Sequence, residues 1–478
     1  MDSAELAFAG IARQAELIRS KEISSRELVQ VYLDRIARLD PQLNSFRVVL
    51  EERALLEADQ ADGRAGSGDD RPLLGVPVAI KDGWDVAGEF TTHGTGAYGP
   101  AKTEDCEFVR RLRDAGAVII GKTLQPELAL WMFTETSTWG VTRNPWNPDH
   151  VPGGSSGGSG AAVAAGLVGA ASASDGAGSI RIPAAACGLF GLKPQRGRVP
   201  MWPYNDHWHG LSVAGCVSRS VADTALWLDV VGGASDRDPA SAIAPPAEPL
   251  SAVAQRPPGQ LRVAMSFASP THAPVAAETR KAVEEMAAAM EGLGHRVTPR
   301  DPDYGSRLGG LSSDVGLSLS LRFLHGGAED ADAMARPGKL MRRTKQVQFM
   351  GHLIPDDFLA RDRAKEAAIA ARVNQVFDDH DVLMTPTVGS PPIEVGRFEG
   401  RGALATIYTG LRGFGAAFTG TWNVCGNPAA SVPAGIGEDG LPLAVQLIGR
   451  PGDEATLVSL AAQLEAERPW AQRLPAVS

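Results

Sequence analysis

The sequence has no uninterrupted apolar run of about 18 residues or more, so we expect no transmembrane helix. It also lacks a basic N-terminal segment followed by a long apolar core, which predicts a cytoplasmic protein without a signal peptide. Basic residues are not in excess, because 46 Lys and Arg stand against 56 Asp and Glu, a formal net charge of −10. A chain without a basic surplus is not expected to bind nucleic acid or an anionic membrane.

Cysteine is scarce and nucleotide-binding motifs are missing. The four cysteines form no C-x-x-C pair, so we expect buried free thiols in a reducing compartment. Glycine is plentiful, but GGSSGGSG at 153–160 lacks the Gly-Lys-Ser/Thr that ends a P-loop. It also lacks the G-x-G-x-x-G pattern, followed by a distant acid, of a dinucleotide site. A nucleotide cofactor is therefore not expected.

What the sequence does contain is typical of a globular enzyme: 44% of its residues are hydrophobic and 21% are charged. We expect an α/β fold, with residues 1–478 forming a single large domain around a central mixed β-sheet covered by helices on both faces. Residues 1–65 are expected to form a helical arm packed on the core, and residues 303–355 an irregular insertion. Helical periodicity and caps predict helices over 24–40, 50–63, 104–115, 220–232, 276–294 and 453–467.

The stretch from 144 to 194 is dense in Gly, Ala and Ser, and it contains Ser155 and Ser179. GGSSG around Ser155 fits the G-x-S-x-G elbow of α/β-hydrolases. That elbow needs a strand directly before the serine, whereas the turn-rich NPWNP at 144–148 precedes it, and the similar HGG at 325–327 lies downstream. A flexible linker is the other alternative, but the apolar small-residue helix expected at 161–167 disfavours it.

Two further features point to acyl-transfer chemistry. Lys81 ends an apolar run, GVPVAIK, that predicts a buried parallel strand, and ligands commonly lie at the carboxyl ends of such strands. A lysine that simply reaches solvent remains the alternative from this segment alone. Ser179 follows a tight turn at 175–178, whose successive N–H groups could bind an oxyanion.

Several segments together resemble the amidase signature family of serine hydrolases: GVPVAIKD at 75–82, TRNPWN at 142–147, PGGSSGGSGAAVAAG at 152–166, SDGAGSIRIPAAACGLFGLKP at 174–194, SRSVADTALWLDVV at 218–231 and LPLAVQLIGRPGDE at 441–454. The resemblance implies that Ser179 is the nucleophile, that Ser155, in a cis peptide, bridges to it, and that Lys81 is the base. It also implies that Asp175 and Arg181 support the turn. The oxyanion hole would be formed by the backbone amides of Gly176, Ala177, Gly178 and Ser179.

The chemistry of this set needs a neutral lysine. A serine hydroxyl is a poor nucleophile without a neighbouring base. The amine of Lys81 has a reference pKa of about 10.4, and burial can lower it because desolvation disfavours the charged form. Ser155 can donate one hydrogen bond and accept another, so it can pass a proton between Ser179 and Lys81. This course needs no metal or cofactor.

Aromatic segments suggest the substrate. We expect Trp131, Met132, Phe133 and Thr134, together with Trp202 from a second aromatic cluster at 202–208, to line an apolar pocket. Ordinary core packing is the alternative for these residues. The Gly/Thr-rich segment 410–427 likewise forms either part of the core or a second wall of the pocket. The expected reaction is hydrolysis of small-molecule aryl or bulky apolar acyl amides, and also of esters or carbamates, by a monomer or homodimer. By family analogy, residues 303–355 border the substrate channel.

Two other functions share the signature. One is the glutaminase subunit of a tRNA-dependent amidotransferase, which commonly reads SIRQPA where this chain has SIRIPA at 179–184. The other is a non-catalytic relative, which the intact Lys81, Ser155 and Ser179 disfavour. One residue departs from the family pattern: Ala177 stands where many members have glycine, so the oxyanion side of the site is expected to be narrower.

Overall fold

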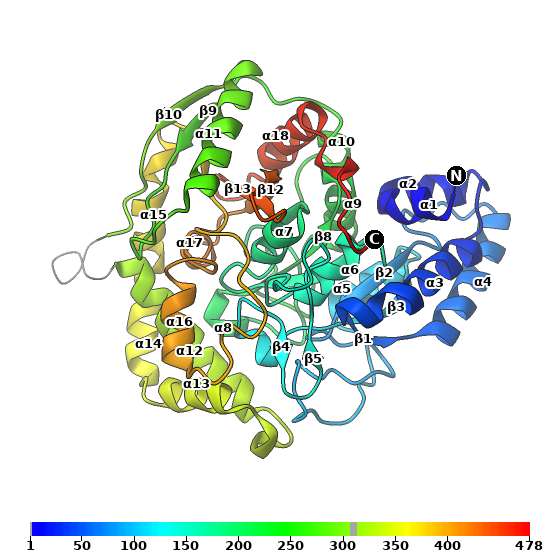
Figure 1. Ribbon diagram of the computed structural model, residues 1–478, viewed down its shortest axis with the longest axis horizontal. Helices are drawn as coiled ribbons and strands as arrows, with labels where there is room; N and C mark the ends of the chain where they lie inside the picture. Colours follow the sequence, from blue (N-terminus) through cyan, green and yellow to red (C-terminus); the bar gives the residue numbers. More distant parts are fainter. Residues whose placement is uncertain (1, 306–312) are drawn as a thin grey trace.

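The computed structural model describes residues 2–305 and 313–478, and its core is built on two β-sheets (Figure 1). The first sheet has the strand order β1-β3-β2-β6-β8. Its strands β2, β3 and β6 run parallel, whereas β1 and β8 are antiparallel to their neighbours. The bounds are β1 Phe46–Val49, β2 Pro77–Lys81, β3 Val118–Thr123, β6 Ala170–Asp175 and β8 Val213–Ser218.

The second sheet has the order β10-β9-β11-β13-β12-β7 and is also mixed. Phe190 and Ser218 exchange two backbone hydrogen bonds of 3.0 and 3.1 Å, which join its β7 edge to β8 of the first sheet. The bounds are β7 Gly191–Lys193, β9 Arg262–Met265, β10 Arg296–Pro299, β11 Val382–Pro386, β12 Ala429–Ile436 and β13 Pro442–Gly449; a separate hairpin joins β4 Glu135–Thr136 and β5 Gly140–Val141. The predicted single-domain α/β fold with mixed sheets is therefore confirmed.

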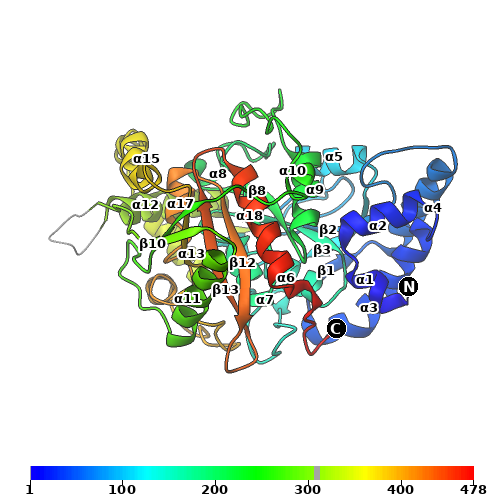
Figure 2. The same cartoon turned by 90° about the horizontal axis from the view of Figure 1, so that it is seen from above.

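Helices surround the sheets, with α7, α11 and α18 packed against β12 and β13 (Figure 2). Of the helices in the described residues, none is both long and apolar enough to cross a lipid bilayer. The helices of the core and its connections are α5 Glu107–Asp114, α6 Gly157–Ala164, α7 Arg181–Cys187, α8 His207–Gly210, α9 Val221–Val231, α10 Leu250–Val253, α11 Ala277–Gly292, α14 Asp356–Arg363, α15 Glu366–Val373, α16 Ala403–Gly410, α17 Thr421–Cys425 and α18 Glu454–Glu467.

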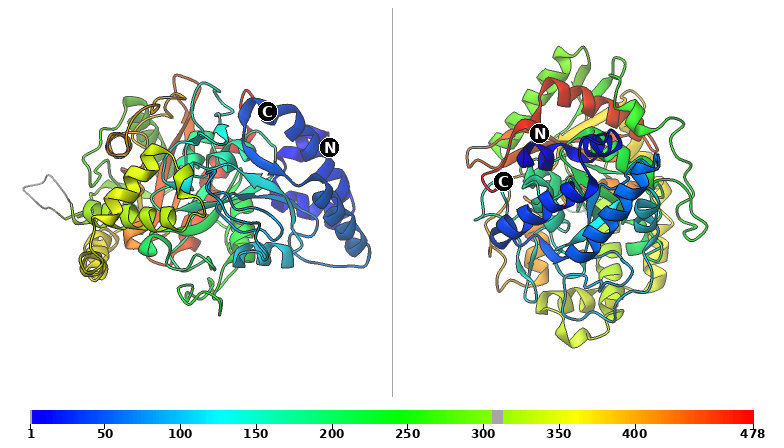
Figure 3. Two further views of the ribbon diagram at one scale, coloured as in Figure 1. Left: turned by 90° about the horizontal axis from the view of Figure 1, so that it is seen from below. Right: turned by 90° about the vertical axis from the view of Figure 1, so that its right-hand side faces the viewer.

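Four helices at the N-terminus lie side by side on one flank of the molecule (Figure 3, right): α1 Ser3–Phe8, α2 Gly10–Arg19, α3 Ser25–Leu43 and α4 Glu51–Gly66. The helix expected over 24–40 begins with a capping box, because Ser24 and Glu27 bond reciprocally at the start of α3. The expected end of this helix at residue 40 is wrong, since α3 continues through Pro41 to Leu43. The Asp40 carboxylate accepts the N–H groups of Ser45 and Phe46, so it organises the chain just beyond the helix.

The expectation of an irregular segment over 303–355 is also wrong for most of its length, and residues 306–312 lie outside the described part of the chain. The segment forms α12 Asp314–Asp332 and α13 Arg342–His352. Glycine and serine are typical of loops, but in α12 these small residues permit the helix to pack closely against its neighbours. A Cβ on Gly326 would lie 2.7 Å from a ring atom of Trp208, so this helix is held against its neighbours by tertiary contact.

Candidate active site

Lys81 ends β2 with its side chain fully buried and its amine among hydroxyl groups. Its Nζ lies 2.7 Å from Ser155 Oγ, 2.9 Å from Ser156 Oγ and 2.8 Å from Ser174 Oγ. Burial lowers the pKa of Lys81 well below its usual value, and the charge of Asp175 offsets only part of this effect. The amine of Lys81 is therefore neutral at lower pH than the amine of a solvated lysine.

Ser155 follows a tightly enclosed glycine. The Gly154–Ser155 peptide bond is cis, as the family resemblance implied. A Cβ on Gly154 would lie 2.5 Å from the carbonyl oxygen of Trp131, so only glycine fits between this segment and the chain at 131–133. The structure thus brings Ser155 Oγ to Lys81.

Ser179 sits just after the turn that ends β6. Gly178 has φ of +134°, and a Cβ there would lie 2.4 Å from Thr419 Oγ1, so the turn requires glycine at this position. Ser179 is half-buried and faces the same cavity as Gly154. Ser155 and Ser179, both in the described part of the chain, make no hydrogen bond with each other in this structure.

The turn corrects the expected oxyanion hole at one position. The amide of Gly178 donates to Asp175 Oδ1 at 2.6 Å, so it is not free to bind an oxyanion. The amide of Ile180 donates to the other oxygen of the same carboxylate at 3.1 Å. For the amides of Gly176, Ala177 and Ser179, the described residues provide no hydrogen-bond acceptor.

A buried network fixes this turn. Arg181 donates to both oxygens of Asp175, at 2.9 and 2.8 Å, and also to Gln446 Oε1 at 2.6 Å and Asn423 Oδ1 at 2.6 Å. Burial alone would raise the pKa of Asp175, but the charge and hydrogen bonds of Arg181 hold it at about 2. The carboxylate is therefore ionised at neutral pH and acts as an anchor for the turn rather than as an acid or base.

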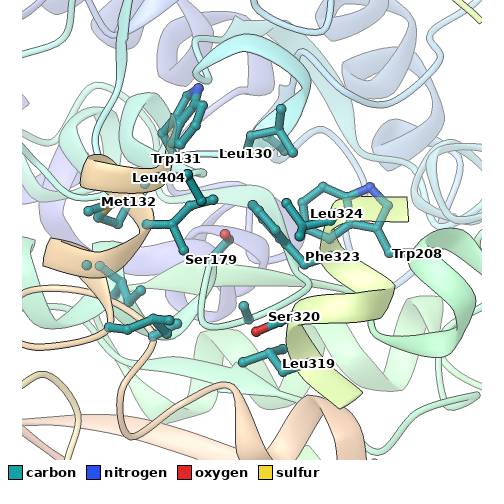
Figure 4. A pocket seen from close by; sticks show the side chains of 18 residues that line it. Leu130, Trp131, Met132, Ser179, Trp208, Leu319, Ser320, Phe323, Leu324 and Leu404 are labelled. Atoms are coloured by element: carbon teal, nitrogen blue, oxygen red, sulfur yellow. The ribbon is translucent and has the colours of Figure 1, made fainter. Parts of the chain in front are cut away.

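Ser179 opens into a cavity of about 240 Å³ with an almost wholly apolar wall (Figure 4). Helix α12 forms one side and α16 forms another. Among the described residues, none that lines the cavity carries a charge: Ala129, Leu130, Trp131, Met132, Gly154, Ala177, Ser179, Ile182, Trp208, Leu319, Ser320, Phe323, Leu324, Leu404, Ile407, Gly410, Leu411 and Ala416. The site can therefore enclose an uncharged, apolar group beside the nucleophile candidate.

The aromatic prediction holds only in part. Trp131 and Met132 line the cavity, and so does Trp208 from the second aromatic cluster. Phe133 lies behind them, stacked on Phe398 with ring centroids 4.9 Å apart. The other two expected lining residues also lie elsewhere.

Thr134 donates to the carbonyl oxygen of Gly153 at 3.1 Å and is buried outside the cavity wall. The guanidinium of Arg237 stacks over Trp202, with Arg237 Cζ 3.3 Å from the centroid of the Trp202 ring. Composition alone could not separate these residues from the true lining, because core and pocket use the same side chains.

Sequence reasoning missed Ser156 and Ser174, which also contact Lys81. Ser172 and Ser174 are two apart on β6, and Ser172 Oγ accepts the N–H of Lys81 at 2.8 Å. The period-two spacing of these serines beside an apolar strand was the available signal. Residues 303–355 were expected to border the substrate channel, and α12 of this segment does line the cavity, although its helical form was not expected. The second wall considered at 410–427 contributes Gly410, Leu411 and Ala416.

The mixed α/β fold is that of amidase signature enzymes, and comparison with known proteins shows the family. The family model described as "Amidase" matches residues 27–458, so the chain belongs to the amidase family, whose members hydrolyse carbon–nitrogen bonds other than peptide bonds. "Putative amidase AmiB2" of Mycobacterium tuberculosis is 47% identical over all of both chains. The 6-aminohexanoate-cyclic-dimer hydrolase of Paenarthrobacter ureafaciens is 36% identical over 97% of this chain and 95% of its own.

Solved structures give the same result. A 6-aminohexanoate cyclic dimer hydrolase complexed with substrate matches with a TM-score of 0.88 and 32% identity, covering 99% of this chain and 100% of its own. A bacterial aryl acylamidase described as an amidase signature enzyme matches with a TM-score of 0.85 and 25% identity, covering 99% and 97%.

Proposed function

We propose that this chain is an amidohydrolase that acts on bulky, uncharged acyl or aryl amides, and also on esters and carbamates, through Ser179, Ser155 and Lys81. The observation that carries the proposal is the buried amine of Lys81, which meets three hydroxyls and lies near a serine that opens into an apolar cavity. Action in the cytoplasm as a monomer or homodimer is part of the same proposal.

The proposed course is acyl transfer. Ser179 Oγ attacks the substrate carbonyl carbon while its proton passes to Ser155, and the proton of Ser155 passes to the neutral amine of Lys81. This relay requires Ser179 Oγ to come within hydrogen-bond distance of Ser155 when substrate is bound. The free amides of Gly176, Ala177 and Ser179 are the candidate donors to the oxyanion.

Collapse of the tetrahedral intermediate returns the proton through Ser155 to the leaving nitrogen, which departs as an amine. The acyl group is then held as an ester on Ser179. Water attacks this ester, again with Lys81 as the acceptor of the proton, and releases the acid. Only side chains of this chain and water are needed for these steps.

The cavity supports the choice of substrate class. Its uncharged lining offers no partner for the ammonium and carboxylate of glutamine, which disfavours the glutaminase alternative. The relatives named as a cyclic amide hydrolase and an aryl acylamidase are consistent with amide bonds in apolar surroundings. Burial of such a group beside Ser179 favours binding by roughly 25 cal/mol for each Å² of apolar surface removed from water.

The test combines a nucleophile variant with a substrate survey. Ser179→Ala is expected to lose turnover and acyl-enzyme while keeping the wild-type circular dichroism spectrum. Acyl-enzyme detected by mass spectrometry in Ser179→Ala would reject Ser179 as nucleophile. Rates of the pure wild-type chain on anilides, aliphatic amides, esters, carbamates and glutamine are expected to be highest for the bulky apolar compounds, and preferential glutamine hydrolysis would reject the proposed substrate class.

A further inference from the structure

A cluster of metal-ligating side chains lies at the edge of the cavity, on residues that the proposed reaction does not use. It consists of His209 from α8 with His325 and Glu329 from α12. Both imidazoles are largely buried, with about 15% of each side chain exposed, and Glu329 is about half exposed. A metal ion could therefore enter from the solvent side.

The separations of the ligand atoms suit a small divalent cation. His209 Nε2 lies 3.0 Å from His325 Nδ1 and 3.2 Å from Glu329 Oε2, and His325 Nδ1 lies 3.5 Å from Glu329 Oε1. In a tetrahedral zinc site with bonds of about 2.0–2.2 Å, ligand atoms are about 3.3–3.5 Å apart. The two imidazole nitrogens and the Glu329 carboxylate thus have nearly the spacing of three corners of such a site, and water can take the fourth.

A second observation is the hydrogen bond on the far side of His325. Its Nε2 lies 3.1 Å from Asp356 Oδ1, at the start of α14. A carboxylate in this position accepts the Nε2 proton and leaves Nδ1 with a free lone pair directed at the cluster. Metal-ligating histidines commonly have this arrangement. Without a cation and with both histidines neutral, at most one N–H lies within the cluster. His325 Nδ1 and the two Glu329 oxygens then compete for this single donor.

The backbone at His209 is a third observation. Trp208 and His209 both adopt the left-handed region, with φ of 52° and 54°, which is rare for bulky residues and costs free energy. This conformation directs His209 toward α12. Trp208 Nε1 donates to Asp330 on the same helix at 2.7 Å, so contacts on both sides of Glu329 hold the two elements together.

We infer that His209, His325 and Glu329 bind one divalent transition-metal ion, with zinc the best fit to two imidazoles and a carboxylate. The ion has no part in the acyl transfer. It joins α12 to the turn at 207–210 and so fixes two parts of the cavity wall, because Trp208 and Phe323 line the cavity. The expectation that the reaction needs no metal is unchanged, because this ion has a structural role. The inference also holds whether or not Ser179 is the nucleophile.

The test titrates Co²⁺, a spectroscopic substitute for zinc, into untagged full-length protein that has been freed of metal with a chelator. One equivalent is expected to bind with visible d–d absorption of a four- or five-coordinate site and to raise the thermal midpoint. His209→Gln and His325→Gln are each expected to lose this absorption. Asp356→Asn, which changes only the outer partner, is expected to weaken binding about 10- to 100-fold.

His352→Gln is the matched control. His352 also pairs with an aspartate, with Nε2 2.8 Å from Asp332 Oδ2, but it is not a member of the cluster. It is expected to bind Co²⁺ like the wild type. If a histidine variant fails to fold, as shown by circular dichroism, Glu329→Gln replaces it because that side chain is exposed. Absence of stoichiometric binding to the wild type, or binding unchanged in the cluster variants, would overturn the inference.

Discussion

Two buried lysines on neighbouring strands meet opposite surroundings. Lys81 ends β2. Lys122 lies on the neighbouring parallel strand β3, where it pairs with Ile80, the residue before Lys81. Both side chains are fully buried. Lys81 Nζ contacts three serine hydroxyls, whereas Lys122 Nζ lies 2.9 Å from Asp82 Oδ1 and also donates to the Phe90 carbonyl.

The difference shows that partners, more than burial, decide what a buried lysine can do. Burial lowers the pKa of both amines. Asp82 raises the pKa of Lys122 again, because a nearby carboxylate favours the ammonium, while Lys81 has only the weaker influence of Asp175. Lys122 is therefore suited to a structural ion pair, and Lys81 to accepting a proton.

The largest expected effect comes from removing the proposed base. Lys81→Met is expected to lower kcat/KM for amides by about 10³-fold, which is typical for loss of a general base. Esters should lose less, because an alcohol departs with less need of a proton than an amine does. Steady-state rates on a matched amide and ester measure both losses.

A paired variant of the neighbouring lysine provides the control. Lys122→Met combined with Asp82→Asn removes both charges of the structural pair and is expected to keep most amide hydrolysis per folded molecule. A similar loss in this variant and in Lys81→Met, or equal losses of amide and ester activity in Lys81→Met, would contradict the separation of roles.

The next effect is on stability. Asp82→Asn alone leaves the ammonium of Lys122 buried without its carboxylate partner, and breaking such a pair costs about 3–5 kcal/mol. Urea unfolding of the wild type and the single variant at pH 7 measures this loss. The double variant with Lys122→Met should recover part of it. A single variant as stable as the wild type would mean that Asp82 does not hold Lys122 as an ion.

The two lysines also mark how far the sequence could predict the site. Motifs around Lys81, Ser155 and Ser179 predicted the family, which the comparisons confirm, because those residue types and spacings serve little else. Nothing local distinguished Lys122, whose partner Asp82 is 40 positions away and comes near only through strand pairing. The helical form of α12 was hidden for the same reason: its Gly326 packs against Trp208, a contact that no local pattern reports.

A smaller effect is the pH dependence of stability. With its pKa lowered, Lys81 is deprotonated in the folded state at pH values where the unfolded chain, with a pKa of about 10.4, is protonated. The unfolded state then binds more protons, so this residue costs stability at neutral pH, and the cost shrinks as pH rises toward about 10.4. Lys81→Met should therefore exceed the wild type in stability most at neutral pH and least near pH 10.

Urea unfolding of both proteins across this pH range measures the difference between them. A difference that stays constant with pH would show that the lysine is charged in the folded protein. The lowered pKa of Lys81 also predicts the pH dependence of catalysis. The kcat/KM of the wild type should fall as pH drops through this pKa, because protonation removes the base.

The smallest expected effect concerns the departure from the family pattern. Ala177 has no positive φ, and its methyl group contributes to the cavity wall. Ala177→Gly is therefore expected to change kcat for a bulky amide by less than about threefold and to cost about 0.5–1 kcal/mol, because glycine loses more backbone freedom on folding. Gly178→Ala is the matched contrast next in the chain, where φ of +134° and a Cβ 2.4 Å from Thr419 Oγ1 predict a severe loss. If both variants behaved alike in rate and urea unfolding, the turn would not be as tightly constrained at Gly178 as its contacts indicate.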